Sequence, residues 1–390
     1  MHKETHTAVM LNCWNQKLGE ITFANKPSEF HKLIRKVSRF VTEEKTVVYG
    51  LENAYGYGRP LAVWLIEKGC AVKDVNTALS FAQRKSVPMY QKSDSYDAEA
   101  VALVLINMLD RLPDAVPDDK YWTLSQLVNR RDNICIHLHR LKNQLHEQLF
   151  VAYPSYKKFF SDISRNTALY FFGTYPSPEH VTGLTAEQLA SELRLVSHNS
   201  CSVKRAEKIL ELVHTDGQTK RDHQESRDAI TRSLVTDLMH YRNQLGEIEE
   251  AIESILPDFQ CTLMTMPGID MITAAKILSE IGDINRFSNA NKLAKFAGIA
   301  PVNFSSAGKG KDMCPKQGNR RLQAIFYFLA IQMIQISING TPRNRIFREY
   351  YLKRVEEGKN KQQALICIAR RLVNIVYGML KNHTEYRNPE

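Results

Sequence analysis

Two aspartates in the first hundred residues have the spacing of a cation site. Asp94 and Asp97 lie three residues apart in KSDSYDAEAVA (92–102), where a helix is expected to begin. Residues three apart share one face of a helix, and carboxylates are favoured near a helix N-terminus. Helix capping, with Ser93 or Asp94 as the N-cap and Asp97 at the third helical position, is the alternative for this pair taken alone.

A third carboxylate, Glu52, lies near the end of TVVYGLEN (46–53), an apolar run typical of a buried strand. A carboxylate there is costly to bury unless it binds a cation or a partner. The carboxyl ends of strands in open α/β sheets are also where ligands bind. The alternative is a glutamate just clear of the sheet. Together, Glu52, Asp94 and Asp97 predict a hard-cation site, because Mg²⁺ prefers oxygen ligands and nucleases use such ions on phosphodiesters.

A second kind of chemistry is indicated by AGIAPVNFSSAGKGKDMCPKQGNRR (297–321), whose Gly, Ser and Pro content predicts a loop. It places Ser305 and Ser306 ahead of five cations. A serine can hold a covalent intermediate, and cations offset charge that develops on a phosphate. A phosphate-binding loop without covalent chemistry is the alternative. The five cations are Lys309, Lys311, Lys316, Arg320 and Arg321.

The elements expected around the carboxylates alternate between strand and helix. This alternation predicts an α/β fold with a mostly parallel sheet covered by helices. The expected elements are a hairpin (7–11 and 19–25), a helix (27–43), a strand (46–53), a helix through Leu61 and Leu65, and a strand (71–76).

The middle and the end of the chain are expected to be helical. Residues 120–150 and 222–256 carry apolar residues at alternating spacings of three and four, which predicts a coiled-coil seam. The two helices could pair with each other or with a second subunit, and a plain helical bundle has the same pattern. In 257–390 the expected helices are 266–283, 321–338, 343–355 and 361–380.

The net charge of +10 is confined to the last third of the chain. Residues 257–390 hold 20 Lys and Arg against 10 Asp and Glu, whereas residues 1–256 hold 32 of each. A basic region joined to a neutral one indicates a polyanion partner, most often nucleic acid. A basic enzyme with a solvated surface is the alternative.

Composition excludes several classes of protein. With 43% hydrophobic and 24% charged residues, the 390-residue chain is globular and long enough for two or three domains. Its seven cysteines form no CxxC pair, which excludes a zinc ribbon and a disulfide scaffold and favours a reducing cytoplasm. No apolar run reaches the ~18 residues of a membrane span, and the N-terminus lacks a signal-peptide pattern.

The stretches around Glu52, around Asp94 and Asp97, and around Ser305 and Ser306 resemble, in this order, the DEDD-type transposases of insertion sequences, the bridge-RNA-guided serine recombinases. The resemblance implies a Mg²⁺-dependent enzyme that excises and inserts its own element, acts on DNA as a homo-oligomer, and is guided by an element-encoded RNA. It implies a RuvC-like (RNase H-fold) domain at 1–115, a helical, coiled-coil region at 116–256 and a helical transposase domain at 257–390. The similar stretches are HKETHTAVML, GLENAYGYG, KSDSYDA, MPGIDMITAAKIL and RFSNANKLAKFAGIAPVNFSSAGKGKDMCPKQGNRRL.

The resemblance also implies roles for single residues. Glu52, Asp94 and Asp97 match the second, third and fourth members of the family's metal-binding tetrad. The family's nucleophilic serine lies five residues after the proline of a Gly-x-x-Pro loop, which here ends at Pro301, so the position is Ser306. The family usually has glycine directly after this serine. Here an alanine intervenes, so Ser305 is the reserve candidate.

The first member of the tetrad is not in this sequence. The family places that aspartate two residues before a His-Lys pair, which here is His2-Lys3. The aspartate and most of the first strand would fall ahead of Met1, and that strand is central in a RuvC-like sheet. We therefore expect translation to begin upstream; a truncated copy that only binds nucleic acid is one alternative. A metal-only DNA nuclease of the RuvC type is another, and a Ser306→Ala variant separates it from the recombinase.

Overall fold

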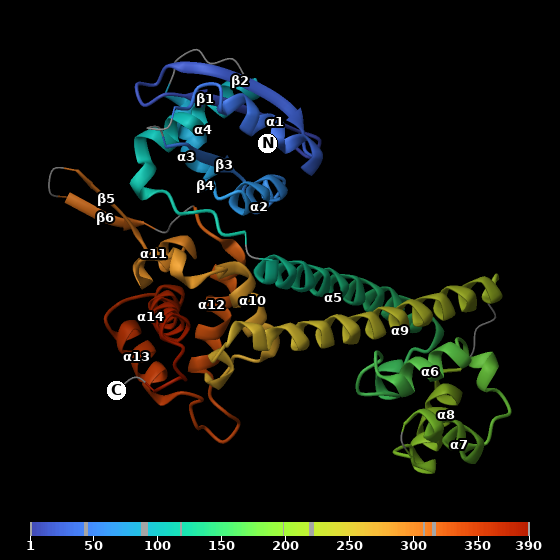
Figure 1. The fold of residues 1–390 in the computed structure, drawn as a ribbon. Coiled ribbons are helices and arrows are strands. Elements are labelled where there is room, and N and C mark those ends of the chain that lie inside the picture. The colour runs from blue at the N-terminus through green and yellow to red at the C-terminus, as the bar shows by residue number, and fades with distance from the viewer. Residues whose placement is uncertain are drawn as a thin grey trace. The chain divides into compact units, whose positions relative to one another are not determined.

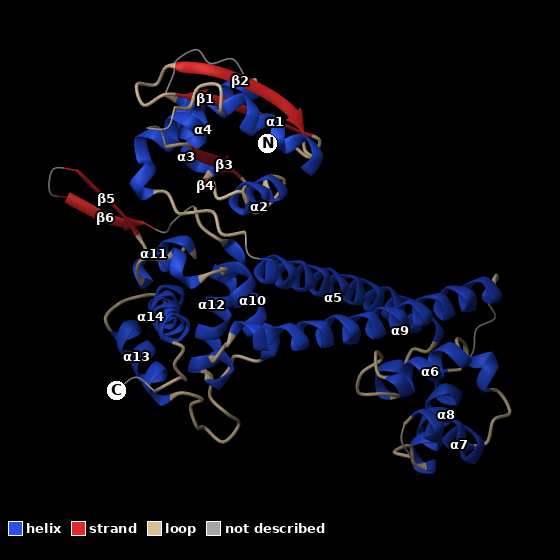
Figure 2. Ribbon diagram, in the orientation of Figure 1, coloured by secondary structure: helices blue, strands red, loops and turns tan. Residues whose placement is uncertain are grey.

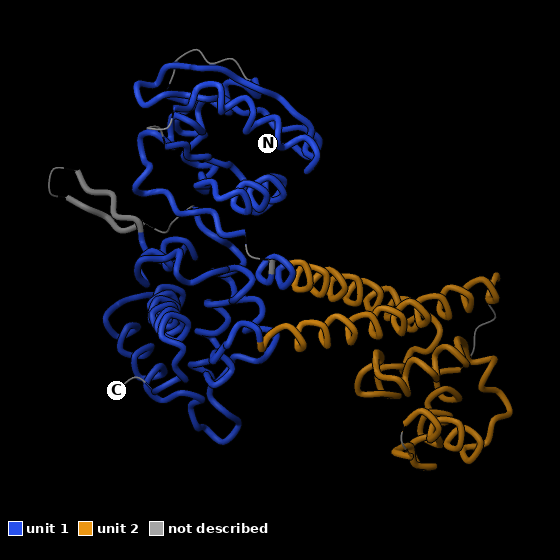
Figure 3. The backbone as a smooth tube through the Cα atoms, viewed as in Figure 1, with its two compact units in different colours: residues 1–125, 258–390 blue, residues 126–257 orange. Residues whose placement is uncertain are grey.

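The chain forms two compact units in the computed structural model (Figures 1, 2 and 3). One unit joins residues 1–125 to 258–390, and the other is 126–257. The first unit contains an α/β part, up to residue 117, and a helical part from residue 258. The structure describes residues 2–42, 46–86, 93–117, 119–197, 199–217, 222–306, 309–313 and 317–388.

The α/β part has the element order expected from the sequence, with one helix added. The added helix is α3, whose N-cap Asn76 accepts a hydrogen bond from the amide of Ala78 at 2.8 Å. The elements are β1 (Thr5–Leu11), β2 (Lys17–Ala24), α1 (Pro27–Val37), β3 (Val48–Glu52), α2 (Arg59–Glu67), β4 (Ala71–Val75), α3 (Thr77–Lys85) and α4 (Asp94–Met108).

The sheet is not the mostly parallel one that the alternation predicted. β1 and β2 form an antiparallel hairpin, with Thr5 opposite Ala24. β3 and β4 form a separate parallel pair, with Glu52 opposite Val75. The strands therefore make two sheets of two strands each.

A cavity of about 920 Å³ separates these two sheets. Consecutive residues of both strands line it, His6–Cys13 from the β1 side and Val47–Glu52 from the β3 side. Because alternate residues of a strand point to opposite faces, a lining without gaps means that the backbone edges of β1 and β3 border the cavity. Within the described residues, neither edge has a strand partner on that side. The far edge of β4 is different, since the amide of Ala115 donates to the carbonyl of Val72 at 2.9 Å.

Helices α1 and α2 supply the core beneath the hairpin. Phe30 and Leu33 of α1 are buried with Leu61 and Leu65 of α2. These residues recur at helical spacing, so each helix presents one apolar stripe to the strands. The buried contacts of α1 and α2 therefore hold the strands that border the cavity in place.

The second unit is helical, as the sequence predicted for residues 120–150 and 222–256. Two long helices lie side by side and antiparallel, with Arg131 Nε 2.9 Å from Glu249 Oε1 and the rings of His137 and Tyr241 stacked at 5.5 Å. Shorter helices enclose an aromatic core. The helices are α5 (Asp119–Ala152), α6 (Asn166–Thr174), α7 (Ala186–Val196), α8 (Val203–Asp216) and α9 (Gln224–Ile255), and the core includes Tyr153, Phe159, Phe171 and Phe172.

The basic end of the chain is a helical bundle around α14. Among the described residues, α14 alone is long and apolar enough to cross a membrane, but half of its most apolar stretch is buried. It packs against α11, α12 and α13, as expected of a core helix. The helices are α10 (Met271–Ile281), α11 (Ala290–Phe296), α12 (Arg320–Ile334), α13 (Arg345–Glu356) and α14 (Lys361–Asn382).

The expectation of a loop over 297–321 is wrong in part. Residues of this stretch form an antiparallel hairpin of β5 (Val302–Ser306) and β6 (Lys309–Met313). Short 3-10 helices connect other elements of the chain. They are η1 (Leu109–Arg111), η2 (Tyr156–Lys158), η3 (Pro178–Val181), η4 (Leu256–Phe259), η5 (Leu263–Thr265) and η6 (Ile284–Arg286).

Candidate functional site

The three predicted carboxylates all line the cavity between the two small sheets. Glu52 is the last residue of β3, and Asp94 and Asp97 lie in the first turn of α4. Across the described part of the chain, no three His, Cys, Asp or Glu side chains are grouped closely enough to hold one metal ion. The carboxylates thus share a cavity without converging on one point. Their donor set, carboxylate oxygen throughout, is the kind that suits Mg²⁺.

Glu52 is held by a residue that the sequence did not indicate. The hydroxyl of Ser80 lies 2.8 Å from Glu52 Oε1, and Ser80 is fully buried. Ser80 belongs to α3, which follows β4, the strand paired with β3. The contact joins residues 28 positions apart, so no local pattern could have revealed it.

Helix capping and the cation site, the two interpretations of the Asp94–Asp97 pair, are compatible in the structure. Ser93 is the N-cap of α4, and its side chain accepts a hydrogen bond from the amide of Tyr96 at 3.2 Å. Because Ser93 caps the helix, the carboxylates of Asp94 and Asp97 are available for other contacts. The positive end of the helix favours both charges.

Both aspartates have basic neighbours. Asp94 Oδ1 lies 3.4 Å from His2 Nε2, and both side chains are largely exposed. Asp97 Oδ1 lies 2.7 Å from Nη1 of Arg84, and this pair is mostly shielded from solvent. Arg84, like Ser80, belongs to α3, and no pattern in the sequence indicated a role for it.

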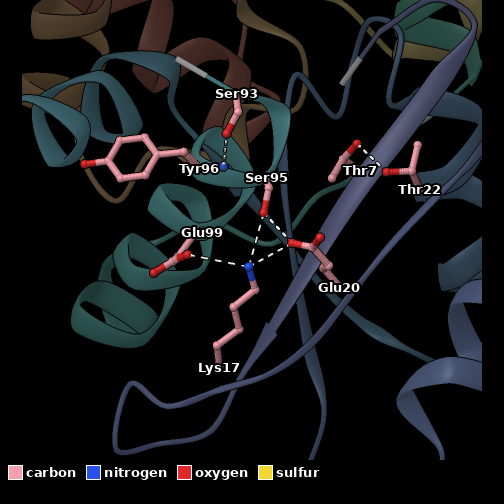
Figure 4. A network of polar contacts seen from close by, with 8 residues as sticks. All are labelled: Thr7, Lys17, Glu20, Thr22, Ser93, Ser95, Tyr96 and Glu99. Atoms are coloured by element: carbon pink, nitrogen blue, oxygen red, sulfur yellow. Dashed lines mark hydrogen bonds and ion pairs between the residues drawn. The ribbon is translucent and has the colours of Figure 1, made fainter. Parts of the chain in front are cut away.

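A polar network fixes the first turn of α4 against the hairpin (Figure 4). Lys17 Nζ of β2 lies 2.8 Å from Glu20 Oε2 and 3.2 Å from Ser95 Oγ, and Ser95 donates to Glu20. Glu99, one turn further along α4, lies 4.0 Å from the same ammonium. The hydrogen bonds from Lys17 and Ser95 lower the pKa of Glu20. The turn that bears Asp94 and Asp97 is therefore tied to β2.

The predicted nucleophile lies on the β5–β6 hairpin. Ser306 is the last residue of β5, opposite Lys309, and Ser305 is opposite Gly310. Lys311 lies opposite Phe304. The structure describes only the backbone of these strands, and Lys316 lies outside the described residues.

The two predicted arginines are the first two residues of α12. Arg320 donates to Gln323 Oε1 at 2.7 Å. Arg321 Nη1 lies 3.5 Å from Glu280 Oε1, and its side chain is 64% exposed. The arginines therefore begin α12, the helix that follows the hairpin in the chain.

Two glycines let the chain cross itself at this base. Gly298 has φ +66° and Gly318 has φ +127°. A Cβ atom on Gly318 would lie 2.6 Å from the Cα of Gly298. Nearby, the amide of Asn319 donates to the carbonyl of Phe296 at 2.7 Å. Only glycine at 318 permits so close a crossing.

We expect a Gly318→Ala variant to be destabilised by about 2 kcal/mol or more, because it combines a positive φ with a backbone clash. Thermal unfolding measures the change. A Gly340→Ala variant is the matched control, since Gly340 has φ +77° but no atom within 4 Å of the added carbon. Equal losses in the two variants would contradict the close crossing.

Comparison with known families matches both ends of the chain. Residues 1–154 match a transposase model of the DEDD, IS110 type, and residues 261–352 match the transposase IS116/IS110/IS902 family. The first stretch contains Glu52, Asp94 and Asp97, and the second contains the β5–β6 hairpin.

Individual relatives come from mobile elements. The chain is 27% identical over 302 residues to the insertion element IS116 uncharacterized 44.8 kDa protein of Streptomyces clavuligerus, covering 75% of this chain and 71% of that protein. It is 24% identical over 389 residues to the insertion element IS900 uncharacterized 42 kDa protein of Mycobacterium paratuberculosis, covering 98% and 95%. It is 24% identical over 161 residues to the transposase for insertion sequence element IS1111A of Coxiella burnetii, covering 40% and 43%.

Proposed function

Because this chain belongs to the IS110 family of DEDD transposases, we propose that it excises and inserts its own insertion sequence by a Mg²⁺-dependent reaction with a serine nucleophile. The observation that carries this proposal is the position of Glu52, Asp94 and Asp97, which reach one cavity from β3 and α4. The α/β part that holds them corresponds to a RuvC-like domain. The order hairpin, helix, strand, helix, strand and helix supports that correspondence.

The chemical step divides between the carboxylates and Ser306. When bound, Mg²⁺ supplies Lewis-acid stabilisation of charge on the phosphate. The Oγ of Ser306 loses its proton and forms a bond to phosphorus. The P–O bond to the leaving strand breaks, and that strand departs with a protonated hydroxyl. One phosphodiester is exchanged for another, so no further reactant is required.

The partners follow from charge and from family membership. The excess of Lys and Arg in residues 257–390 favours contact with DNA and RNA backbones, which makes binding salt-dependent. An element-encoded guide RNA would leave the choice of DNA sites to base pairing. A homo-oligomer would bring two DNA ends together, with the long helices α5 and α9 as its support.

The proposal is tested by replacing single carboxylates. In a reaction with co-expressed RNA, Mg²⁺ and DNA spanning the element junction, Glu52→Gln and Asp97→Asn are expected to reduce strand exchange by about 10²-fold or more, because each removes a charged ligand. Chelation of divalent ions should abolish it. Strand exchange is measured as junction product on a gel.

Asp110→Asn is the matched control, because Asp110 follows α4 in η1 and does not line the cavity. Loss of activity in Asp110→Asn equal to that in Asp97→Asn would contradict a special role for the cavity. Hydrolytic cuts without joined products would favour a metal-only nuclease. Binding of DNA without any cut would favour an inactive copy.

A further inference from the structure

One helix, α3, contacts two of the three carboxylates. Ser80 and Arg84 lie four residues apart on it, and positions four apart share one helix face. Ser80 contacts Glu52 and Arg84 contacts Asp97. We propose that α3 sets the affinity of this site for divalent metal, with Ser80 positioning Glu52 and Arg84 competing with the metal for Asp97. This inference rests on the proposed metal site and extends it to residues outside the carboxylate set.

Ser80 is built to hold Glu52 in one orientation. Its side chain is fully buried, with Oγ 2.8 Å from Glu52 Oε1 and 3.0 Å from the carbonyl oxygen of Thr77. The one hydroxyl proton of Ser80 is shared between these two acceptors, and burial holds Oγ beside the carboxylate of Glu52. It engages one oxygen of Glu52 and fixes the direction of the other, which is how an outer residue raises the affinity of a metal ligand.

Arg84 has other contacts besides the one with Asp97. Its guanidinium carbon lies 5.7 Å from the centre of the Phe81 ring, and its carbonyl oxygen accepts a hydrogen bond from the hydroxyl of Tyr96 at 3.4 Å. Its Nη1 lies 2.7 Å from Asp97 Oδ1, with 19% of the Arg84 side chain and 30% of the Asp97 side chain exposed. Without a metal, Asp97 is therefore already paired with the guanidinium of Arg84.

A guanidinium and a divalent ion on one carboxylate compete in two ways. They take the same oxygen lone pairs, and they repel each other at short range, most strongly where water is excluded. The metal must displace Arg84 from Asp97 or bind Asp97 beside the positive charge of Arg84. Removal of Arg84 should therefore strengthen metal binding, whereas removal of the Ser80 hydroxyl should weaken it.

The test measures Mn²⁺ binding to the full chain without nucleic acid. Electron paramagnetic resonance reports the concentration of free Mn²⁺, and added Mg²⁺ competes for the site. Arg84→Gln is expected to lower the dissociation constant at least about threefold, and Ser80→Ala to raise it about 10-fold, within the range for outer-shell residues. Lys85→Gln and Ser86→Ala are the matched controls. Lys85 lies over the Phe81 ring at 4.5 Å, and Ser86 donates to the carbonyl of Gln83 at 2.7 Å.

The opposite signs keep the inference separate from a general loss of structure, since misfolding would weaken both variants. Unchanged or weaker binding by Arg84→Gln would overturn it, as would an equal gain in Lys85→Gln or no binding by any variant. The strand-exchange reaction is scored separately. Its failure beside the expected Mn²⁺ pattern would remove the proposed recombination and leave the metal-site inference standing.

Discussion

A chain lengthened ahead of Met1 by one apolar β-strand ending in aspartate is expected to unfold roughly 8–16 °C higher than the 390-residue chain. The cavity of about 920 Å³ between β1 and β3 accepts such a strand. Filling it would bury apolar side chains and pair backbone groups on both bordering edges. A gain of about 2 kcal/mol produces a shift of this size in a domain of about 100 residues.

The start of the described chain points the added strand into the cavity. The amide of His2 donates to the carbonyl of Thr5 at 2.9 Å, which leaves Lys3 and Glu4 as a two-residue hairpin loop. A residue ahead of His2 would therefore run antiparallel to β1, and about seven residues would match the length of β1. The resulting order is β2, β1, the added strand, β3 and β4.

The same geometry places the end of the added strand beside the carboxylates. His2 Nε2 lies 3.4 Å from Asp94 Oδ1, so an aspartate two residues ahead of His2 would lie near Glu52, Asp94 and Asp97. We expect this fourth carboxylate to tighten Mn²⁺ binding. Asparagine in its place should retain the gain in unfolding temperature and lose the gain in metal binding.

A matched extension with two central prolines serves as the control, because proline cannot donate to a strand partner. It adds the same length of chain without completing the sheet. Differential scanning calorimetry of the three proteins measures the effect. An apolar strand that raises the midpoint no more than its proline counterpart would contradict the pairing of the β1 and β3 edges.

Local patterns predicted the elements of the α/β part, and long-range pairing decided what the patterns could not. The apolar runs at 46–53 and 71–76 predicted β3 and β4 to within two residues. They could not predict that β1 and β3 are separated by a cavity, because that depends on how strands far apart in the chain pair. The roles of Ser80 and Arg84 could not be predicted either. They lie on α3, a helix of nine residues, and their partners Glu52 and Asp97 lie on β3 and α4.

The serine region shows how tertiary contacts override composition. Gly, Ser and Pro over 297–321 predicted a loop, yet β5 and β6 pair there in register. The close approach of Gly298 and Gly318 brings the ends of the segment together. In the sequence, this close approach is marked only by the two glycines themselves. Glycines are equally typical of an ordinary turn, so they do not predict that the two positions meet. The apolar pattern of 222–256 did not decide between a partner helix in the same chain and one in a second subunit. In the structure α9 lies against α5, with Arg131 of α5 bonded to Glu249 of α9.

Replacing Ser306 is expected to remove covalent attachment of DNA to the protein. With co-expressed RNA, Mg²⁺ and labelled junction DNA, the native serine should retain label on the protein in a denaturing gel. Ser306→Ala lacks the oxygen that bonds to phosphorus, so we expect the adduct to fall roughly 10³-fold or more. DNA binding should persist, because the basic residues of 257–390 are unchanged.

Ser305→Ala is the matched control, because it removes a hydroxyl from the neighbouring position of β5. The four outcomes separate the chemical alternatives. An adduct lost only in Ser306→Ala supports the proposed nucleophile, and one lost only in Ser305→Ala moves the nucleophile by one residue. Cleavage without any adduct in the unmodified chain contradicts serine chemistry and leaves the carboxylates to act alone.

The fourth outcome, with neither cleavage nor adduct, is resolved by the extended chain. If the added strand completes the metal site, an adduct should appear only in the protein that ends this strand in aspartate. The asparagine version has the same sheet and the same serine. If it forms no adduct, the difference is due to the carboxylate of the added aspartate. An adduct absent from every version, while Mn²⁺ binds tightly, would reject Ser306 as the nucleophile, because metal site and serine would both be present without reaction.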